Sequence, residues 1–291
     1  MRLNFYLPDF YPAFYRNQLM ADLRQTYPQY FYEGAGIGAV YGSFPGAVWN
    51  GGRVERGICE KDKMEYVVHE FNRRGIPCRY TFTNPLLEEK HLYDTYCNLC
   101  MEIGNNGMNE VLVNSPILEE YIRDRYPGYR LISSTTRLLD TLQQEEEEQK
   151  KDYKLVVLNK NFNNTPELFS LSNKDHYEIL VNSYCCDECS ESADHYEAVG
   201  RAQLNFRSSD YPQCKYVRRN FYELMENKSF VTVEDLYEKY VPAGFCHFKL
   251  DGRAFPEYSV MESYLYYMIR PQWRDRVRLM LQKAIIEIRK Y

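Results

Sequence analysis

The sequence predicts a parallel α/β fold: a single (β/α)8 barrel of the TIM type, incomplete or irregular in places, with helices at its C-terminal end. Short β-prone runs alternate with helix-like segments, an order typical of parallel sheets with right-handed crossovers. Roughly eight such runs can be counted. The chain has 291 residues, long enough for one barrel with a terminal extension. An open doubly wound sheet is the alternative fold.

Eight segments are expected to form the strands. Four of them are β-prone, largely apolar runs that end in asparagine, and strands buried on both faces have this composition. These runs are residues 79–83, 110–113, 154–158 and 177–181, followed by Asn84, Asn114, Asn159 and Asn182. The remaining strands are expected at residues 3–7, 38–41, 131–134 and 245–250.

Helix-like segments separate several of these strands. The first two cover about residues 61–74 and 88–103, and each is followed by glycine, which commonly ends a helix. The third begins after Ser115-Pro116, with proline in its first turn. The fourth covers about residues 137–151, and its glutamate run, residues 145–148, is interpreted as exposed surface.

The whole chain, residues 1–291, is expected to be one barrel domain because no linker rich in Gly, Ser or Pro interrupts it. Residues from about 190 to 240 fit a plain βα unit poorly and predict an irregular excursion. Two terminal helices are expected between about residues 258 and 289.

Composition narrows the range of partners. The formal net charge is −5, from 36 basic and 41 acidic residues, which argues against capture of bulk nucleic acid or of an anionic membrane. No stretch approaches the roughly 20 apolar residues that span a membrane, and no signal peptide is recognised. With nine cysteines read as reduced thiols, a cytoplasmic location and a small-molecule substrate are expected, with the oligomeric state left open.

Three cysteines stand directly after the strand predicted at 177–181. Cys185 and Cys189 have C-x3-C spacing, and Cys186 and Cys189 have C-x2-C spacing. Thiolates are soft ligands that hold iron–sulfur clusters or zinc, so the spacing predicts a metal site. Cys214 and Cys246, further along the chain, could complete the ligand set. The alternative is that these cysteines are ordinary buried thiols.

A glycine-containing loop at Asn50-Gly51-Gly52-Arg53 predicts a substrate-binding element. Glycines let backbone N–H groups approach an anion, and the arginine fork suits carboxylate or phosphate. A tight structural turn with an exposed arginine is the alternative.

The four asparagines that end the strands fall at the rim where barrel enzymes build their sites. They are therefore candidate substrate-binding residues that form a ring of amide groups facing a ligand. The alternative is turn and helix-cap chemistry, for which asparagine is also well suited.

The last predicted strand leads to Lys249, Asp251 and Arg253. By alternation, Lys249 and Asp251 share one face with His247, whereas Cys246 points toward the helices. A Lys–Asp pair in a barrel mouth predicts an acid/base or substrate-charge element, and a structural ion pair is the alternative.

The hexapeptide Phe248-Lys249-Leu250-Asp251-Gly252-Arg253 resembles the FKIEGR-type strand of the collagenase-like peptidase family, peptidase family U32, and residues 178–189 resemble its cluster-bearing region. The resemblance implies a TIM-type barrel. For several members it also implies a [4Fe–4S] cluster on four cysteines, here with Cys185, Cys189 and Cys214 as ligands. Some members resemble oxygen-independent hydroxylases, and others are described as peptidases.

Three functional hypotheses follow. The first is a barrel enzyme of this family type that carries a cysteine-bound iron–sulfur cluster and acts on a small anionic or aromatic substrate. The second is a peptidase-like hydrolase, with zinc on the cysteines or with no metal, that uses Lys249 and Asp251. The third is a non-catalytic binding barrel without a cofactor.

Overall fold

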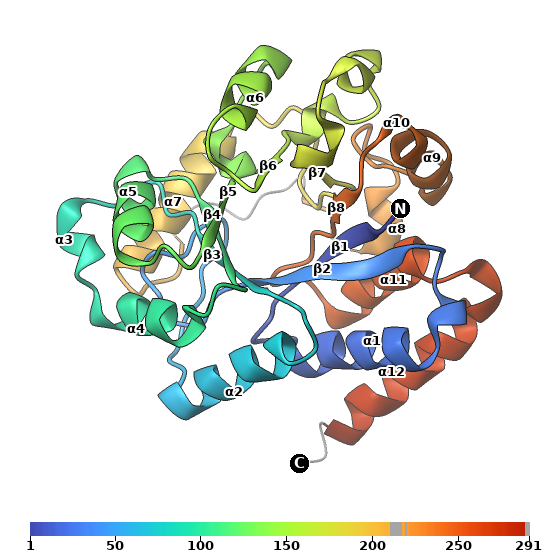
Figure 1. Cartoon of the computed structure of the whole chain (residues 1–291), viewed down its shortest axis with the longest axis horizontal. Helices are drawn as coiled ribbons and strands as arrows, with labels where there is room; N and C mark the ends of the chain where they lie inside the picture. Colours follow the sequence, from blue (N-terminus) through green and yellow to red (C-terminus); the bar gives the residue numbers. More distant parts are fainter. Residues whose placement is uncertain (210–216, 219, 289–291) are drawn as a thin grey trace.

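The computed structural model is a closed barrel of eight parallel strands that follow one another in chain order (Figure 1). It describes residues 1–209, 217–218 and 220–288. The barrel closes because the first strand pairs in parallel with both the second and the eighth. The predicted (β/α)8 fold is therefore confirmed. The strands are β1 (Leu3–Pro8), β2 (Ala35–Gly42), β3 (Cys78–Phe82), β4 (Glu110–Val113), β5 (Arg130–Ser133), β6 (Leu155–Val157), β7 (Tyr177–Leu180) and β8 (His247–Lys249).

Helices surround this barrel but do so unevenly. The connection from β6 to β7 contains short 3₁₀ turns in place of an α-helix, so the outer ring is irregular, as predicted. The two terminal helices pack together on the side of the barrel where the first helix lies (Figure 1). The helices are α1 (Phe14–Thr26), α2 (Lys61–Asn72), α3 (Glu89–Leu92), α4 (Thr95–Gly104), α5 (Pro116–Arg125), α6 (Leu142–Gln149), α7 (Ser192–Leu204), α8 (Phe221–Leu224), α9 (Val233–Asp235), α10 (Val241–Ala243), α11 (Glu257–Met268) and α12 (Arg274–Ile288).

Two predicted helices have different bounds in the structure. The helix expected over residues 88–103 is divided at Asp94, whose side chain accepts a hydrogen bond from the backbone N–H of Cys97 and caps α4. The helix expected from residue 137 starts only at Leu142. The helix starts later than expected because Leu138 adopts a left-handed backbone conformation, with φ of 55°, that an α-helix cannot contain.

The interpretation of the glutamate run of α6 as exposed surface is wrong for two of its four residues, whereas Glu147 is exposed as expected. Glu145 is 1% exposed and Glu148 is 4% exposed. Glu148 accepts a hydrogen bond from the Ser133 hydroxyl at 2.6 Å, and Glu145 accepts one from the backbone N–H of Asn159 at 2.9 Å. The composition of a charged run does not reveal these partners, since they come from other elements.

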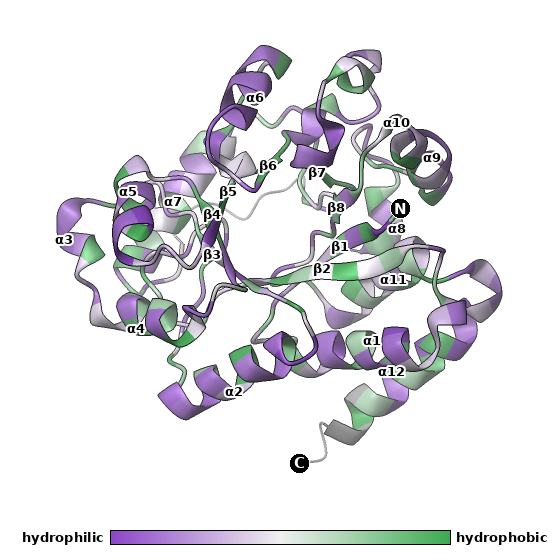
Figure 2. Cartoon of the chain, viewed as in Figure 1, coloured by the Kyte–Doolittle hydropathy of each residue, from purple (hydrophilic) through white to green (hydrophobic). Residues whose placement is uncertain are grey.

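The apolar core has two parts. The larger part fills the space between the strands and the helices, and a smaller cluster occupies the barrel interior. Figure 2 shows the corresponding pattern, with β6 hydrophobic and α6 mostly hydrophilic. The interior cluster consists of Tyr6, Ala39, Tyr41, Leu112, Ile132, Leu155 and Val157.

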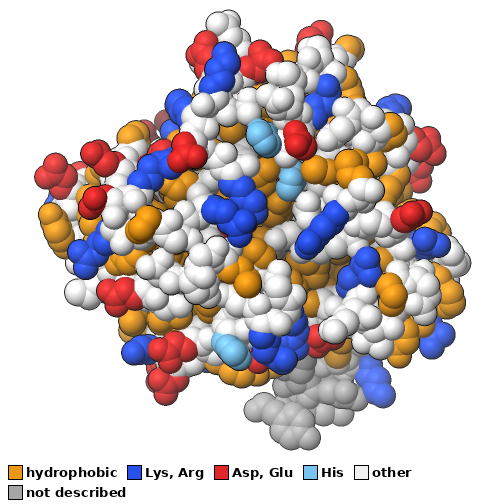
Figure 3. All heavy atoms as spheres, viewed as in Figure 1, with side chains coloured by type: hydrophobic (Ala, Val, Ile, Leu, Met, Phe, Trp, Pro, Cys, Tyr) orange, Lys and Arg blue, Asp and Glu red, His pale blue; other side chains and the backbone are white. Residues whose placement is uncertain are grey.

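The outer surface mixes both signs of charge. On the face seen in Figure 3, acidic and basic side chains are interspersed, although several basic side chains gather near the centre. Within the described part of the chain, no helix is long and apolar enough to cross a membrane.

Candidate functional site

A cavity of about 400 Å³ opens at the C-terminal ends of the strands. Its walls come from segments that end or follow several strands, including Arg53 after β2, Thr83 after β3, Ser134 after β5 and Asp251 after β8. This is the face on which barrel enzymes build their active sites. Eight of the candidate site residues line it, namely Gly52, Arg53, Asn159, Cys185, Cys189, Lys249, Asp251 and Arg253.

Helix α7 covers part of this mouth. It arises in the predicted excursion, and Tyr196 on it lines the cavity. Near its end, Gln203 donates hydrogen bonds to the carbonyl oxygens of Ala47 and Glu55, both at 3.0 Å. The excursion therefore crosses from β7 to the loop after β2 and encloses the cavity from above.

The glycine loop is held from below by Arg253, which is 7% exposed. Its guanidinium donates hydrogen bonds to Asn50 Oδ1, Thr81 Oγ1 and the Gly51 carbonyl oxygen at 3.1, 2.9 and 2.6 Å. A Cβ atom on Gly51 would lie 2.5 Å from the backbone of Thr83. Close packing against the residue after β3 therefore requires glycine at position 51. Asn50, which is buried, supports the loop through its side chain.

Arg53 supplies the charged side chain with which this loop lines the cavity. Its guanidinium donates to the Gly52 carbonyl oxygen at 2.7 Å and lies 5.7 Å from the centroid of the Phe255 ring. Arg53 lines the cavity together with Cys185, Tyr196 and Asp251. This geometry suits capture of a carboxylate or phosphate.

Three of the four rim asparagines do not line the cavity and hydrogen-bond to neighbouring segments. Asn84 is fully buried and donates to the carbonyl oxygens of Val48 and Gly200. Asn114 donates to Thr136, and Asn182 accepts from the backbone N–H of Asp251 at 2.8 Å. Their amide groups hold neighbouring segments together, a role close to the alternative interpretation. Asn159 lines the cavity, although it also donates to the Leu139 carbonyl oxygen.

Lys249 lies at the bottom of the cavity and is 8% exposed. The alternation predicted for β8 holds, because His247 also faces the interior, where its Nδ1 lies 2.6 Å from the Tyr6 hydroxyl, whereas Cys246 belongs to the outer core. Burial lowers the pKa of Lys249 to about 8, and the nearby Glu178 carboxylate opposes that shift.

The ion pair between Lys249 and Asp251, the alternative interpretation of these two residues, is not formed. Lys249 Nζ instead lies 3.7 Å from Glu178 Oε1, and the Asp251 carboxylate accepts hydrogen bonds from the backbone N–H groups of Tyr184 and Gly252. Alternation correctly placed both side chains at the mouth, but it could not supply the partner, which belongs to β7.

Beneath the cavity floor lies a buried charge network that the sequence analysis missed. Arg79 donates to Glu110 at 2.8 Å and to Glu178 at 2.5 Å, and Lys154 pairs with Glu110. Arg79 and both glutamates are fully buried. The sequence did contain a signal for this network. Each of these predicted strands carries one charged side chain in a largely apolar run, and the basic and acidic residues among them could pair.

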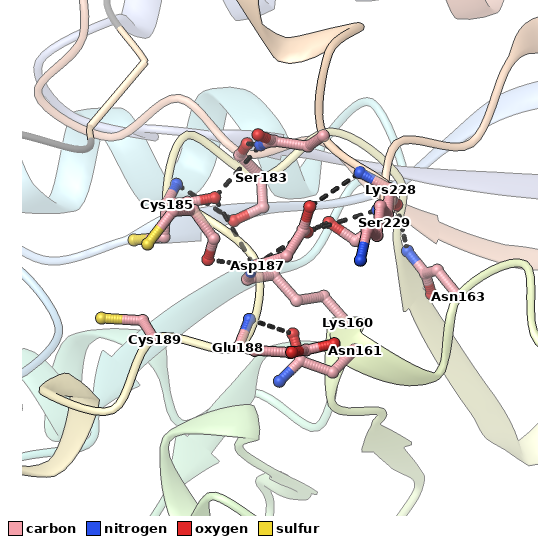
Figure 4. A network of polar contacts seen from close by, with 12 residues as sticks. Lys160, Asn161, Asn163, Ser183, Cys185, Asp187, Glu188, Cys189, Lys228 and Ser229 are labelled. Carbon is pink, nitrogen blue, oxygen red and sulfur yellow. Dashed lines mark hydrogen bonds and ion pairs between the residues drawn. The ribbon is translucent and has the colours of Figure 1, made fainter.

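The cysteine loop is held by Asp187 and Lys160 (Figure 4). Asp187 accepts hydrogen bonds from the backbone N–H groups of Lys228 and Ser229, and it lies 3.6 Å from Lys160 Nζ. Lys160 also donates to the Cys186 carbonyl oxygen at 2.7 Å. The side chains of Cys185 and Cys189 extend to the same side of the loop, away from this network (Figure 4).

The cysteine loop does not by itself complete a metal site. Within residues 1–209, 217–218 and 220–288, no group of three or more His, Cys, Asp or Glu side chains is arranged to hold a metal ion. A [4Fe–4S] cluster needs four thiolates, and Cys185 and Cys189 supply two. The described residues therefore do not form a complete cluster or zinc site. Cys214, the third predicted ligand, lies outside the described residues.

Comparison with known proteins supports the fold. No family model and no curated protein matches the sequence. A solved structure, that of the U32 peptidase Mk0906, is similar to this chain with a TM-score of 0.54 and 15% sequence identity, over 88% of this chain and 95% of that chain. At this identity the similarity shows a shared barrel fold.

Proposed function

We propose that the cavity is the active site of an enzyme that binds a small organic anion and acts on it with Lys249. The supporting observation is the charge of the cavity lining. Four basic side chains line it against two acidic ones, Asp140 and Asp251. The basic side chains are Arg53, Lys160, Lys249 and Arg253.

Arg53 is proposed as the main anion-binding residue. The guanidinium of Arg253 is already engaged with Asn50, Thr81 and Gly51, so its role is to hold the loop. Among the described residues, the guanidinium of Arg53 has one hydrogen bond, to the Gly52 carbonyl oxygen, and Arg53 lines the cavity. An arginine fork can bind both oxygens of a carboxylate. The Tyr196 ring lines the same space and could contact an apolar or aromatic part of the substrate.

Lys249 is proposed as the reacting group because its environment favours the neutral amine. Burial lowers its pKa to about 8, so a useful fraction is unprotonated near neutral pH. Perturbed lysines in a cavity are candidates for acid/base or nucleophilic work. Asp251, which lines the same cavity, is the proposed partner in proton transfer.

This function is tested by binding measurements with a panel of small mono- and dicarboxylates and phosphate esters, using calorimetry on the full chain. Arg53→Met is expected to weaken binding about 10- to 100-fold, since a charge-assisted hydrogen bond contributes about 1.5–3 kcal/mol. Arg125→Met, an exposed arginine on α5, is the matched control. Absence of binding by every anion, or equal loss in both variants, would overturn the proposal.

A metal-dependent reaction is the second proposal, supported by the position of Cys185 and Cys189 in the same cavity wall. Its ligand set would need residues beyond those described. Iron, acid-labile sulfide and zinc are measured on anaerobically purified protein, beside Cys185→Ala and Cys189→Ala. About four irons and four sulfides per chain, lost in both variants, would support a cluster, and stoichiometric zinc would support a hydrolase. Metal-free, folded protein would contradict both.

A further inference from the structure

We propose that Lys249 is a covalent catalyst whose Nζ forms an imine with the carbonyl carbon of a small oxo acid. This inference rests on the proposed function, since it assigns a substrate class and a covalent step to the same cavity. An oxo acid combines the two groups that the cavity would engage: a carboxylate for Arg53 and an electrophilic carbon for the lysine.

The first line of support is the position of the amine. Lys249 ends a barrel strand, so its backbone is held by pairing with both β7 and β1. Its side chain is 11% exposed and lines the cavity that Arg53 faces. A ligand whose carboxylate binds Arg53 therefore meets the lysine on a rigid element, which favours a defined attack geometry.

The second line of support is that the amine stands apart from its nearest carboxylate. Its Nζ lies 3.7 Å from Glu178 Oε1, which is beyond hydrogen-bond distance, and 4.5 Å from the centroid of the Tyr41 ring. Within the described residues, Glu178 Oε1 has no hydrogen-bond partner. A lysine whose only role was an ion pair would be expected to bring its Nζ within hydrogen-bond distance of the carboxylate oxygen.

Two other lysines in the barrel differ in this respect. Lys154 pairs directly with Glu110, and Lys160 donates to the Cys186 carbonyl oxygen at 2.7 Å. Their amines are engaged as donors, whereas the nitrogen lone pair of a neutral Lys249 is available to a ligand. Among these three lysines, Lys249 is the one placed to act as a nucleophile.

The protonation state is consistent with this role. Burial lowers the pKa of Lys249 to about 8, the charges of Arg79 and Arg253 lower it further, and those of Glu178 and Asp251 oppose the shift. At pH 7 roughly a tenth of such an amine is neutral, compared with well under a thousandth of an ordinary lysine. Only the neutral amine can attack a carbonyl.

The chemical step balances without an oxidant or a reductant. The neutral amine adds to the C=O carbon, and a proton moves from nitrogen to oxygen to give a carbinolamine. Loss of that hydroxyl group as water, with one proton supplied, leaves a protonated imine. Asp251 is the proposed proton carrier, and the released water leaves through the open cavity.

The imine is tested by borohydride trapping. The full chain is incubated with pyruvate, glyoxylate or 2-oxoglutarate, reduced with borohydride and examined by intact mass and peptide mapping. One reduced adduct per chain is expected, located on Lys249, with a yield that rises with pH through about pH 8. The adduct should be absent in Lys249→Met and Lys249→Arg and retained in Lys61→Met, which alters an exposed lysine on α2. Adducts spread over surface lysines and unchanged in Lys249→Met would overturn the inference.

A second measurement separates this inference from the proposed function. Calorimetry compares each oxo acid with its hydroxy analogue, such as pyruvate with lactate, in the unaltered protein and in Arg53→Met. If both acids bind in an Arg53-dependent way and no oxo acid is trapped, the imine is refuted and the anion site stands. If neither binds, the proposed function fails and the imine with it. Lys249→Arg preserves the charge, so lost trapping with retained binding and folding would support a covalent role.

Discussion

The inner half of the barrel and its mouth both contain charged side chains, but they use them differently. In the inner half, Arg79 has a glutamate within 3 Å on two sides, and Lys154 pairs directly with one of these glutamates. At the mouth, Lys249 stands 3.7 Å from its nearest carboxylate oxygen, and Arg53 faces a cavity. The charges of the inner half therefore compensate one another within the fold, whereas those at the mouth are available to a ligand.

The largest effect on stability is expected for Arg79→Leu. Its removal leaves the fully buried carboxylates of Glu110 and Glu178 without their shared partner, and breaking a buried pair typically costs about 3–5 kcal/mol. Urea unfolding measures the loss. Arg53→Met is the matched change at the mouth and is expected to cost less than about 1 kcal/mol. Similar losses in the two variants would contradict the distinction.

The next largest effect on stability is expected at Glu145, a buried carboxyl group without a basic partner among the described residues. Burial raises the pKa of Glu145 to about 8, whereas the basic neighbours of Glu110 lower the pKa of that residue despite its burial. Because the pKa of Glu145 is raised on folding, its contribution to stability is fully present below about pH 4.5 and is lost as pH rises through about 8.

Glu145→Gln tests this assignment. The amide removes the cost of ionisation, so the variant is expected to be more stable than the unaltered protein by about 2–4 kcal/mol at pH 8 and by less than about 1 kcal/mol at pH 5. Urea unfolding at the two pH values gives the difference. A variant destabilised to the same extent at both would show that hydrogen bonding to Asn159, and not ionisation, dominates.

The cysteine loop at the rim should respond to Asp187→Ala. This change removes acceptors for Ser229 and Lys228 and the ion-pair partner of Lys160, with an expected cost of about 1–2 kcal/mol. Labelling of Cys185 and Cys189 by a thiol reagent should become several-fold faster, as the loop loosens. Cys97 and Cys100, buried in α4, provide the internal control, and their labelling should be unchanged.

The smallest effect on stability is expected for Lys249→Met. The substitution removes a partly compensated cation and keeps an apolar side chain of similar length, so the change should stay below about 1 kcal/mol. Borohydride trapping should nevertheless be abolished. A loss of stability as large as that of Arg79→Leu would place Lys249 in the structural network of the inner barrel.

The sequence by itself determined the fold and the edge of the barrel at which the cavity lies. Alternating strands and helices are local patterns, since burial on both faces requires apolar runs and parallel pairing requires crossovers. The same local periodicity correctly placed Lys249 inside the barrel and Cys246 outside it. It also placed Arg53 and Asp251 after strands, at the mouth.

Only the tertiary structure decided which partner each polar group has. Glu178, on β7, faces Lys249, and Asn84 contacts Gly200, more than one hundred residues further along the chain. The burial of Glu145 likewise depends on its contact with the residue after β6. Such partners are brought together by closure of the barrel, and no periodicity along the chain encodes which strand lies opposite a given side chain.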